Sequence, residues 1–270
     1  DLSGIYTGIL HGELGYSYAN GESVGDLIAA AALPTLILAG LSIVIWLSLA
    51  VLLGVWTGLR AGTKFDNAVT TVTYVSSTFP TFILGFMMIW IFAVTLGLPP
   101  VSGLTDGRLS PAFGSEAYWQ YFASAPLTAI VDLARHLILP VSTLVIISVA
   151  GDSRYVRASV IDALSAEHVR TARAKGLSRL SILVKHGFRN AAIPVVAIAA
   201  VQLGFMLGGS IVIETVFALH GVGYLAWESI SKNDFPVVQA VVLVLALIYI
   251  GLTLLSDLLN AVLDPRLRSA

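Results

Sequence analysis

The sequence predicts an all-α integral membrane protein with five transmembrane helices. Of the 270 residues, 57% are hydrophobic and 11% are charged, and the mean hydropathy is +0.87. Soluble domains carry about 25% charged residues and about 45–50% apolar ones. A water-soluble fold of this length could not cover so much apolar surface, because its exterior must stay largely polar. Five long apolar stretches, separated by polar connections, indicate where the chain crosses the lipid.

Each stretch meets or approaches the roughly 20 apolar residues that cross a hydrocarbon core of about 30 Å. We expect Pro34 to divide the first into a short entry piece and a span. The third gives the weakest signal, because it is short, follows His136 and contains Pro140. No polar face recurs at helical spacing, which argues against buried helices of a large soluble protein. The stretches are Leu27–Leu59, Tyr74–Leu98, Leu137–Ala150, Ala191–Ile213 and Phe235–Ser256.

The distribution of Lys and Arg predicts the orientation, since these residues are enriched in cytoplasmic loops. Twelve of the 15 basic residues fall in the 60–73 connection, the 151–190 connection and the C-terminal tail. We therefore expect residues 1–26 on the extracellular or periplasmic side and the C-terminus in the cytoplasm. Five crossings with an outside start fit a six-span protein without its first helix, so we expect a further segment upstream of Asp1.

The 151–190 connection has an internal order that an ordinary solvated basic loop does not need. Glu167 lies in the first turn of a predicted short helix, where the helix dipole favours an acid. Gly176 stands where a left-handed C-cap would end that helix, and Ser178 can cap a second one. Small residues beside the glycine would let another protein approach the backbone, and flanking charges could fix its register. The residues predicted to form this docking site are Glu167, Arg170, Thr171, Ala172, Arg173, Ala174, Lys175 and Gly176.

At this point the sequence resembles the ATP-binding-cassette (ABC) import permeases, and specifically their dipeptide, oligopeptide and nickel branch. The run VRTARAKGLS (169–178) followed by KHGFRNAAIPVV (185–196) is similar to that branch almost residue for residue. The general family signature has Glu-Ala-Ala where this chain has Arg170, Thr171 and Ala172, and we expect Glu167 to supply an acid about one turn away. Other similar stretches are HGELGYSYANGESV (11–24), SSTFPTFILG (76–85), IVIETVFALHGVGYL (211–225), DFPVVQA (234–240) and LDPRLR (263–268).

The resemblance implies a six-helix, MetI-like ABC importer permease fold, with residues 27–270 as the permease domain. It places the chain in the cytoplasmic membrane of a bacterium or archaeon. The implied partners are a second homologous permease subunit, two ATP-binding-cassette ATPases that dock on the 151–190 connection, an extracellular or periplasmic substrate-binding protein, and membrane lipid. Short peptides are the first cargo that it implies, with nickel complexes, glutathione and oligosaccharides as alternatives within the family.

Other functions find little support in the residues. There are no cysteines, the five histidines are scattered over both sides of the membrane, and we expect no metal site. Without a phosphate-binding loop the chain should not hydrolyse ATP, so we expect no cofactor on it, with ATP and Mg on the partner ATPases. The sequence has no basic patch interleaved with aromatic residues, so it gives no sign of nucleic-acid binding. A secondary transporter would need ionisable residues near mid-span, which the first, second and fourth stretches lack. A membrane enzyme would need a group of catalytic residues, and the sequence shows none with a recognisable spacing.

Three further features carry open alternatives. Gly204 and Gly208 form a G-x-x-x-G pattern, for which close helix packing is favoured over shaping of the translocation path. Glu214 ends the fourth stretch, where it could face a cavity or partner, or lie in interfacial water. It is the first candidate for contact with substrate or partner. The aromatic cluster within 102–135 favours anchoring at the membrane interface over docking of a binding protein.

Overall fold

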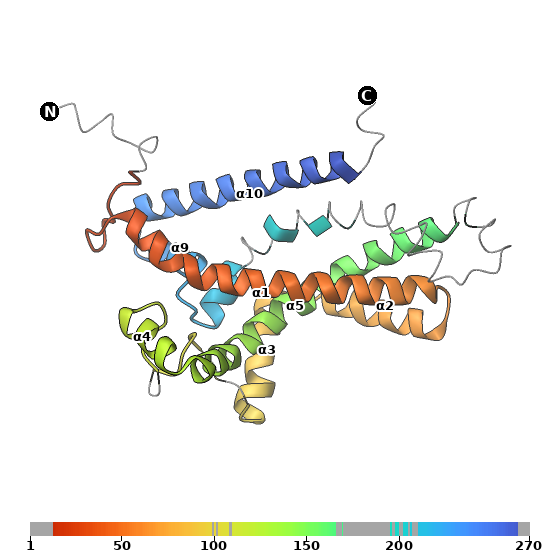
Figure 1. Ribbon diagram of the computed structural model, residues 1–270, viewed down its shortest axis with the longest axis horizontal. Helices are drawn as coiled ribbons and strands as arrows, with labels where there is room; N and C mark the ends of the chain where they lie inside the picture. Colours follow the sequence, from red (N-terminus) through yellow and green to blue (C-terminus); the bar gives the residue numbers. More distant parts are fainter. Residues whose placement is uncertain are drawn as a thin grey trace. The chain divides into compact units, whose positions relative to one another are not determined.

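The computed structural model describes residues 13–98, 100, 102–107, 110–165, 169, 195, 198–199, 202–204, 206 and 210–263. The regular structure of these residues is helical (Figure 1), with an isolated β-bridge between Tyr16 and Ser23. Residues 210–216 form a short helical segment. The other helices are α1 (Val24–Leu59), α2 (Lys64–Ser77), α3 (Thr81–Met88), the π-helix η3 (Ile89–Thr95), α4 (Glu116–Ser124), α5 (Pro126–Ser165), α9 (Val222–Ser231) and α10 (Phe235–Leu263).

Three of the described helices, α1, α5 and α10, are long and apolar enough to cross a membrane. A fourth crossing follows if the interrupted pair of α2 with α3–η3 counts as one span. For two of the predicted spans the first residue agrees closely with the structure. Helix α10 starts at Phe235 as predicted, and α1 starts three residues before Leu27. The predicted span over 191–213 lies mostly outside the described residues.

The first two predicted spans differ from the structure in different ways. The expected break at Pro34 is wrong, because α1 continues for 36 residues with Pro34 inside it. The predicted second span, Tyr74–Leu98, is interrupted instead: α2 ends at Ser77 and α3 begins at Thr81. Pro80 lies in this gap and disfavours a helical conformation in the residue before it, which explains the interruption.

The third predicted span is too short, because Leu137–Ala150 is only the middle of the 40-residue helix α5. Polar turns extend the helix on both sides, and several of their charges have partners. Directly before the apolar window, His136 Nδ1 lies 3.3 Å from a carboxylate oxygen of Asp132, one turn earlier in the helix. Beyond the window, Arg157 forms an ion pair with Asp66. Hydropathy marks the apolar section of a helix and misses turns whose charges are paired.

The described chain divides into two compact units. The first unit contains Asp1–Leu41, Thr81–Leu144 and Met206–Ile248, and the second contains Ser42–Pro80, Val145–Phe205 and Tyr249–Ala270. Helices α1, α5 and α10 each contribute residues to both units. Many large apolar side chains on these helices are exposed, as expected for surfaces that meet lipid rather than water.

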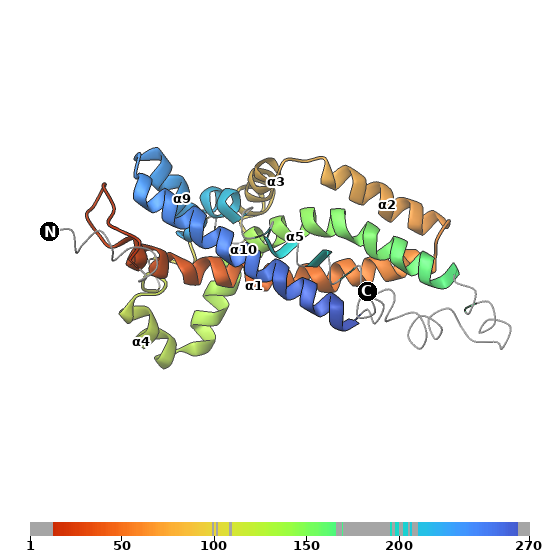
Figure 2. The same cartoon turned by 90° about the horizontal axis from the view of Figure 1, so that it is seen from above.

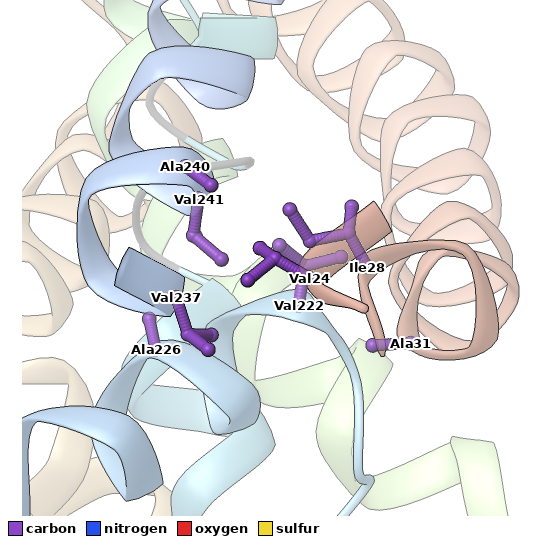
Figure 3. Packing of buried hydrophobic residues seen from close by; sticks show 8 residues of the cluster. All are labelled: Val24, Ile28, Ala31, Val222, Ala226, Val237, Ala240 and Val241. Atoms are coloured by element: carbon purple, nitrogen blue, oxygen red, sulfur yellow. The ribbon is translucent and has the colours of Figure 1, made fainter. Parts of the chain in front are cut away.

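Small and β-branched side chains from three helices form the core of the first unit (Figure 3). Helix α1 provides Val24, Ile28 and Ala31, helix α9 provides Val222 and Ala226, and helix α10 provides Val237, Ala240 and Val241. The β-branched residues have few rotamers to lose on packing, so this cluster fixes the start of α10 against α9 and α1.

A turn formed by residues 15–24 is tied to the loop between α9 and α10. The Asp234 carboxylate accepts hydrogen bonds from the Ser17 hydroxyl and from the N–H groups of Tyr18, at 3.0 Å, and Ala19, at 3.3 Å. Burial alone would raise the pKa of Asp234, but these donors and the Val237 N–H together lower it below its usual 3.8. The carboxylate therefore stays charged, and holds this turn, throughout the physiological pH range.

Two glycines allow close packing of α1 on α5 in the second unit. A Cβ on Gly54 would lie 2.5 Å from Val156 Cβ, and one on Gly58 would lie 2.8 Å from Val160 Cβ. Val160, Leu164 and Val169 continue this contact as a buried cluster. The same part of α5 lies beside α2 (Figure 2), where the Arg154 guanidinium covers the Tyr74 ring at 4.3 Å. Close approach of α1 to α5 therefore depends on the absence of side chains at Gly54 and Gly58.

Replacement of Gly54 by Ala should destabilise the second unit, although Ala is the better helix former. The new methyl group would overlap Val156 and the Ser153 carbonyl, and overpacking of this kind costs about 1–3 kcal/mol. Gly40 in the same helix has no neighbour within 4 Å of its missing Cβ, so Gly40→Ala is the matched control. Thermal unfolding in detergent should show a lower Tm for Gly54→Ala and an unchanged or higher Tm for Gly40→Ala. Equal Tm values for both variants would contradict the packing described above.

Candidate functional site

The predicted docking residues, Glu167 and 170–176, lie outside the described residues. The structure does describe the helix that leads to them, because α5 ends at Ser165. Residues 151–165, predicted as the beginning of a cytoplasmic connection, are thus part of this continuous helix. The position of the last turns of α5 therefore determines where the predicted docking residues begin.

A bidentate ion pair holds the last turns of α5 against α2. Arg157 Nε and Nη2 lie 2.6 Å and 2.7 Å from the two carboxylate oxygens of Asp66. The Gly62 N–H donates to the same carboxylate at 2.9 Å, from the turn between α1 and α2. The Asp66 side chain is 1% exposed and that of Arg157 is 29% exposed. Two parallel hydrogen bonds fix direction as well as distance, so this clamp orients α5 just before the residues predicted to dock a partner.

Glu214, a predicted contact for substrate or partner, is fully buried in the first unit. Its carboxylate accepts hydrogen bonds from the Thr35 hydroxyl of α1 at 2.7 Å and from the Tyr224 N–H at 3.0 Å. Thr35 Oγ1 in turn accepts the Val222 N–H at 2.8 Å. The first N–H groups of α9 have no partner within their own helix, and here Glu214 and Thr35 satisfy them. The interfacial-water interpretation of Glu214 is therefore wrong, and a role in the translocation path stays a prediction.

The loop that joins Glu214 to α9 has an unusual backbone conformation. Ala218 and His220 have φ angles of 49° and 46°, in the left-handed region that residues other than Gly rarely adopt. Gly221 follows, and a Cβ there would lie 2.4 Å from Thr35 Oγ1 and 2.5 Å from Glu214 Oε2. The tight loop and Gly221 thus allow the carboxylate to reach the start of α9.

Gly204 supports the interpretation of close helix packing. A Cβ on Gly204 would lie 2.1 Å from the Tyr249 ring of α10, so the aromatic ring packs directly on the glycine backbone. Gly208, the second glycine of the pattern, lies outside the described residues. A role for either glycine in shaping the path stays a prediction.

The aromatic cluster within 102–135 lies on helix α4, and its rings differ in exposure. Tyr118 is buried and contacts Phe113 with ring centroids 4.9 Å apart, whereas Trp119 is exposed. Burial raises the pKa of Tyr118, and the nearby negative charge of Asp132 adds to this effect. Tyr118 therefore serves the core of the first unit, and Trp119 is the residue left to meet lipid or a partner.

Two pockets open beside this region of the first unit. The larger, of about 920 Å³, is lined by residues of α3, η3 and α5 together with the loop that contains Asp106. Asp132 lies at its edge and accepts hydrogen bonds from Ser110 Oγ at 2.6 Å and from the Asp106 N–H at 3.2 Å. The second pocket, of about 630 Å³, lies between α1 and the loop around His220. Among the residues that the structure describes, no group of three His, Cys, Asp or Glu side chains could hold a metal ion.

Two acids that matter in the second unit are not among the residues predicted from the sequence. Asp66 precedes the predicted second span and gives no sign of its partner, which lies 91 residues further along the chain. The sequence predicts Asp152 in the polar 151–190 connection, but it lies inside α5 and is only 9% exposed. A buried acid in a helix that crosses a membrane usually faces a polar cavity or a partner. The only sequence signal was its place directly after an apolar stretch.

Comparisons with known proteins identify the family. Residues 50–269 match the family described as the binding-protein-dependent transport system inner membrane component. The glutathione transport system permease protein GsiC of Escherichia coli O6:H1 is 37% identical over 263 residues, which cover 96% of this chain and 76% of that protein. The protein of the same name from Salmonella typhi is 37% identical over 266 residues, which cover 97% and 77%.

A solved structure extends this similarity to the fold. The inward-facing MetNI methionine ABC transporter, in its CY5 native crystal form, matches with a TM-score of 0.66 at 18% identity. The match covers 88% of this chain and 96% of that chain. The helical, membrane-crossing architecture described above therefore has a counterpart among ABC transporters. The chain belongs to the family of binding-protein-dependent transport system inner membrane components and is a permease subunit of an ABC importer.

Proposed function

We propose that this permease carries short peptides, glutathione among them, into the cell, driven by ATPase subunits that dock on residues 167–176. The cargo is inferred from relatives named as glutathione transport permeases and from the resemblance of the 169–196 segment to peptide permeases. The protein's share of the work is mechanical. Nucleotide-driven motion of the ATPases shifts the membrane helices between inward-open and outward-open states.

The Asp66–Arg157 clamp is the observation that carries the coupling part of this proposal. It holds the last turns of α5, and the docking residues begin directly after that helix. A force applied to the docking residues would act first on α5, and the clamp would transmit it to α2. A solvated loop without partners would not need a bidentate ion pair whose acid is buried at this position.

The same proposal assigns the remaining partners. A second homologous permease completes the path, two ATPases hold ATP and Mg, and a binding protein delivers the cargo from outside. This chain would bind no cofactor itself. The segment preceding α1 and the loop that contains α4 would face the outside, and the end of α5 would face the cytoplasm, as the Lys and Arg distribution predicts.

The orientation can be tested by cysteine labelling, because the chain has no natural cysteine. Ala117 in α4 and Ser165 at the end of α5 are both exposed. In intact cells an impermeant maleimide should label Ala117→Cys, and it should label Ser165→Cys only after the membrane is permeabilised. Labelling of both variants from the same side would contradict the proposed orientation.

Loss of the clamp should uncouple ATP hydrolysis from transport. Arg157→Gln leaves the buried Asp66 carboxylate without its cation, which costs about 3–5 kcal/mol. In proteoliposomes with the partner subunits, glutathione transported per ATP hydrolysed should fall several-fold. The double variant Asp66→Asn/Arg157→Gln removes the buried charge, so its Tm should recover while transport stays low. Lys232→Gln breaks an exposed pair and serves as the control. Wild-type transport by the double variant would exclude the clamp from coupling.

Docking on residues 167–176 can be tested with a bulky charge. Ala172→Asp places a carboxylate where the ATPase backbone is expected to approach, so co-purification of the ATPase should fall at least about tenfold. Ala158→Asp, at an exposed position of α5, is the matched control and should leave co-purification unchanged. Equal recovery of the ATPase with both variants would place the docking site elsewhere.

A further inference from the structure

Four carboxylates are buried in the part of the chain that the structure describes, and one differs from the others. Asp66, Glu214 and Asp234 each accept hydrogen bonds from donors within the protein. Asp152 Oδ2 is buried and has no hydrogen-bond partner among the described residues. An unpaired carboxylate in a low-dielectric setting costs several kcal/mol, so this group calls for a ligand of opposite charge or a proton.

Among the described residues, Arg154 acts on Asp152 through its charge but is held by other groups. The Arg154 guanidinium lies over the Tyr74 ring, 4.3 Å from its centroid, and Arg154 Nε donates to the Gly151 carbonyl at 3.3 Å. No salt bridge joins Asp152 to any residue within the described ranges. The Trp46 indole interacts with the Asp152 carboxylate, but its N–H does not reach hydrogen-bond geometry. Trp46 is itself 1% exposed, so it gives the carboxylate a low-dielectric neighbour without neutralising it.

Asp152 faces a small pocket within the second unit. The pocket measures about 140 Å³ and is lined by Ile147, Ser148, Gly151, Asp152 and Gln202. Gln202 Nε2 donates to Ser148 Oγ at 2.6 Å, which turns the amide oxygen of Gln202 away from that contact. As far as the described residues go, the lining thus includes a carboxylate, a side-chain amide and a hydroxyl, and no positively charged side chain. Such a set of acceptors favours a cation that carries hydrogen-bond donors.

We propose that the Asp152 pocket binds the primary ammonium group of a transported peptide. A –NH₃⁺ group has three donors and no acceptor, which matches the acceptors of the lining. A water molecule occupies about 30 Å³ of liquid, so the pocket has room for a head group and its first carbon atoms but not for a whole peptide. Asp152 is thus a specificity-determining residue that selects cargo with a free amino end. This inference rests on the proposed function, because peptides and glutathione carry such a group.

Binding can be measured on the permease complex without its binding protein, through the emission of Trp46. The probe is ethylammonium, and tetramethylammonium, which has the same charge but no N–H donor, is the matched control. Ethylammonium should change the emission of the wild-type complex, and this change should disappear in Trp46→Phe. Asp152→Asn should weaken ethylammonium binding about tenfold or more. Asp162→Asn, which alters an exposed acid on the same helix, should bind ethylammonium like the wild type.

The same variants should separate two cargoes. Binding of glutathione should weaken about tenfold in Asp152→Asn, whereas binding of N-acetylglutathione should be equal in Asp152→Asn and the wild type. Equal weakening of both ligands together with a lower Tm would make Asp152 a structural residue and overturn the proposal. So would loss of the second permease from the Asp152→Asn complex, because the occupant would then be a cation of that subunit. An equal response to tetramethylammonium and ethylammonium would likewise overturn it.

The two proposals fail in different ways. If the wild-type complex does not transport glutathione but ethylammonium binding still depends on Asp152, the cargo is wrong and the pocket assignment stands. If glutathione is transported and Asp152→Asn keeps the full preference for ethylammonium and for the free amino end, the pocket assignment is wrong and the proposed cargo stands.

Discussion

A buried carboxylate must be met by hydrogen-bond donors, and this requirement organises much of the described structure. A buried carboxylate is cut off from water, so each acid needs partners from the protein itself. Asp66 draws the end of α5 to α2, Glu214 draws α1 to the start of α9, and Asp234 draws the turn at residues 15–24 to the start of α10. These contacts join segments that are far apart in the sequence. They complement apolar packing, which in lipid lacks much of the drive that it has in water.

Asp152 shows what happens when the requirement is left open. The three satisfied acids make rigid junctions, because their oxygens are occupied by groups fixed to other helices. Asp152 instead lines a pocket, and its Oδ2 has no hydrogen-bond partner among the described residues. The roles proposed for these acids differ in the same way. Junctions transmit force between helices, and a site that selects cargo must be able to exchange its partner during each cycle.

The sequence was sufficient for the fold class and the family, because long apolar stretches and extended motifs are local signals. It also located the start of α10 and predicted the packing role of Gly204. It failed where the result depends on distant partners. The length of α5 depends partly on Arg157 finding Asp66, and the burial of Glu214 depends on Thr35. Neither pairing leaves a mark in local composition, so charged residues that are paired in the structure looked like residues of a solvated loop. The predicted break at Pro34 failed for a similar reason, since hydropathy and proline rules do not include the packing around α1.

The Asp66–Arg157 pair also has a consequence for how the protein is made. The two residues lie 91 positions apart, and ribosomes add about 5–20 residues per second. Asp66 therefore emerges about 5–20 s before its cation exists. During that interval the acid must stay hydrated, which keeps the first turn of α2 at the membrane surface while the intervening chain inserts. Asp66 becomes buried only when Arg157 of α5 pairs with it. The second unit therefore completes its fold only after α5 has been synthesised.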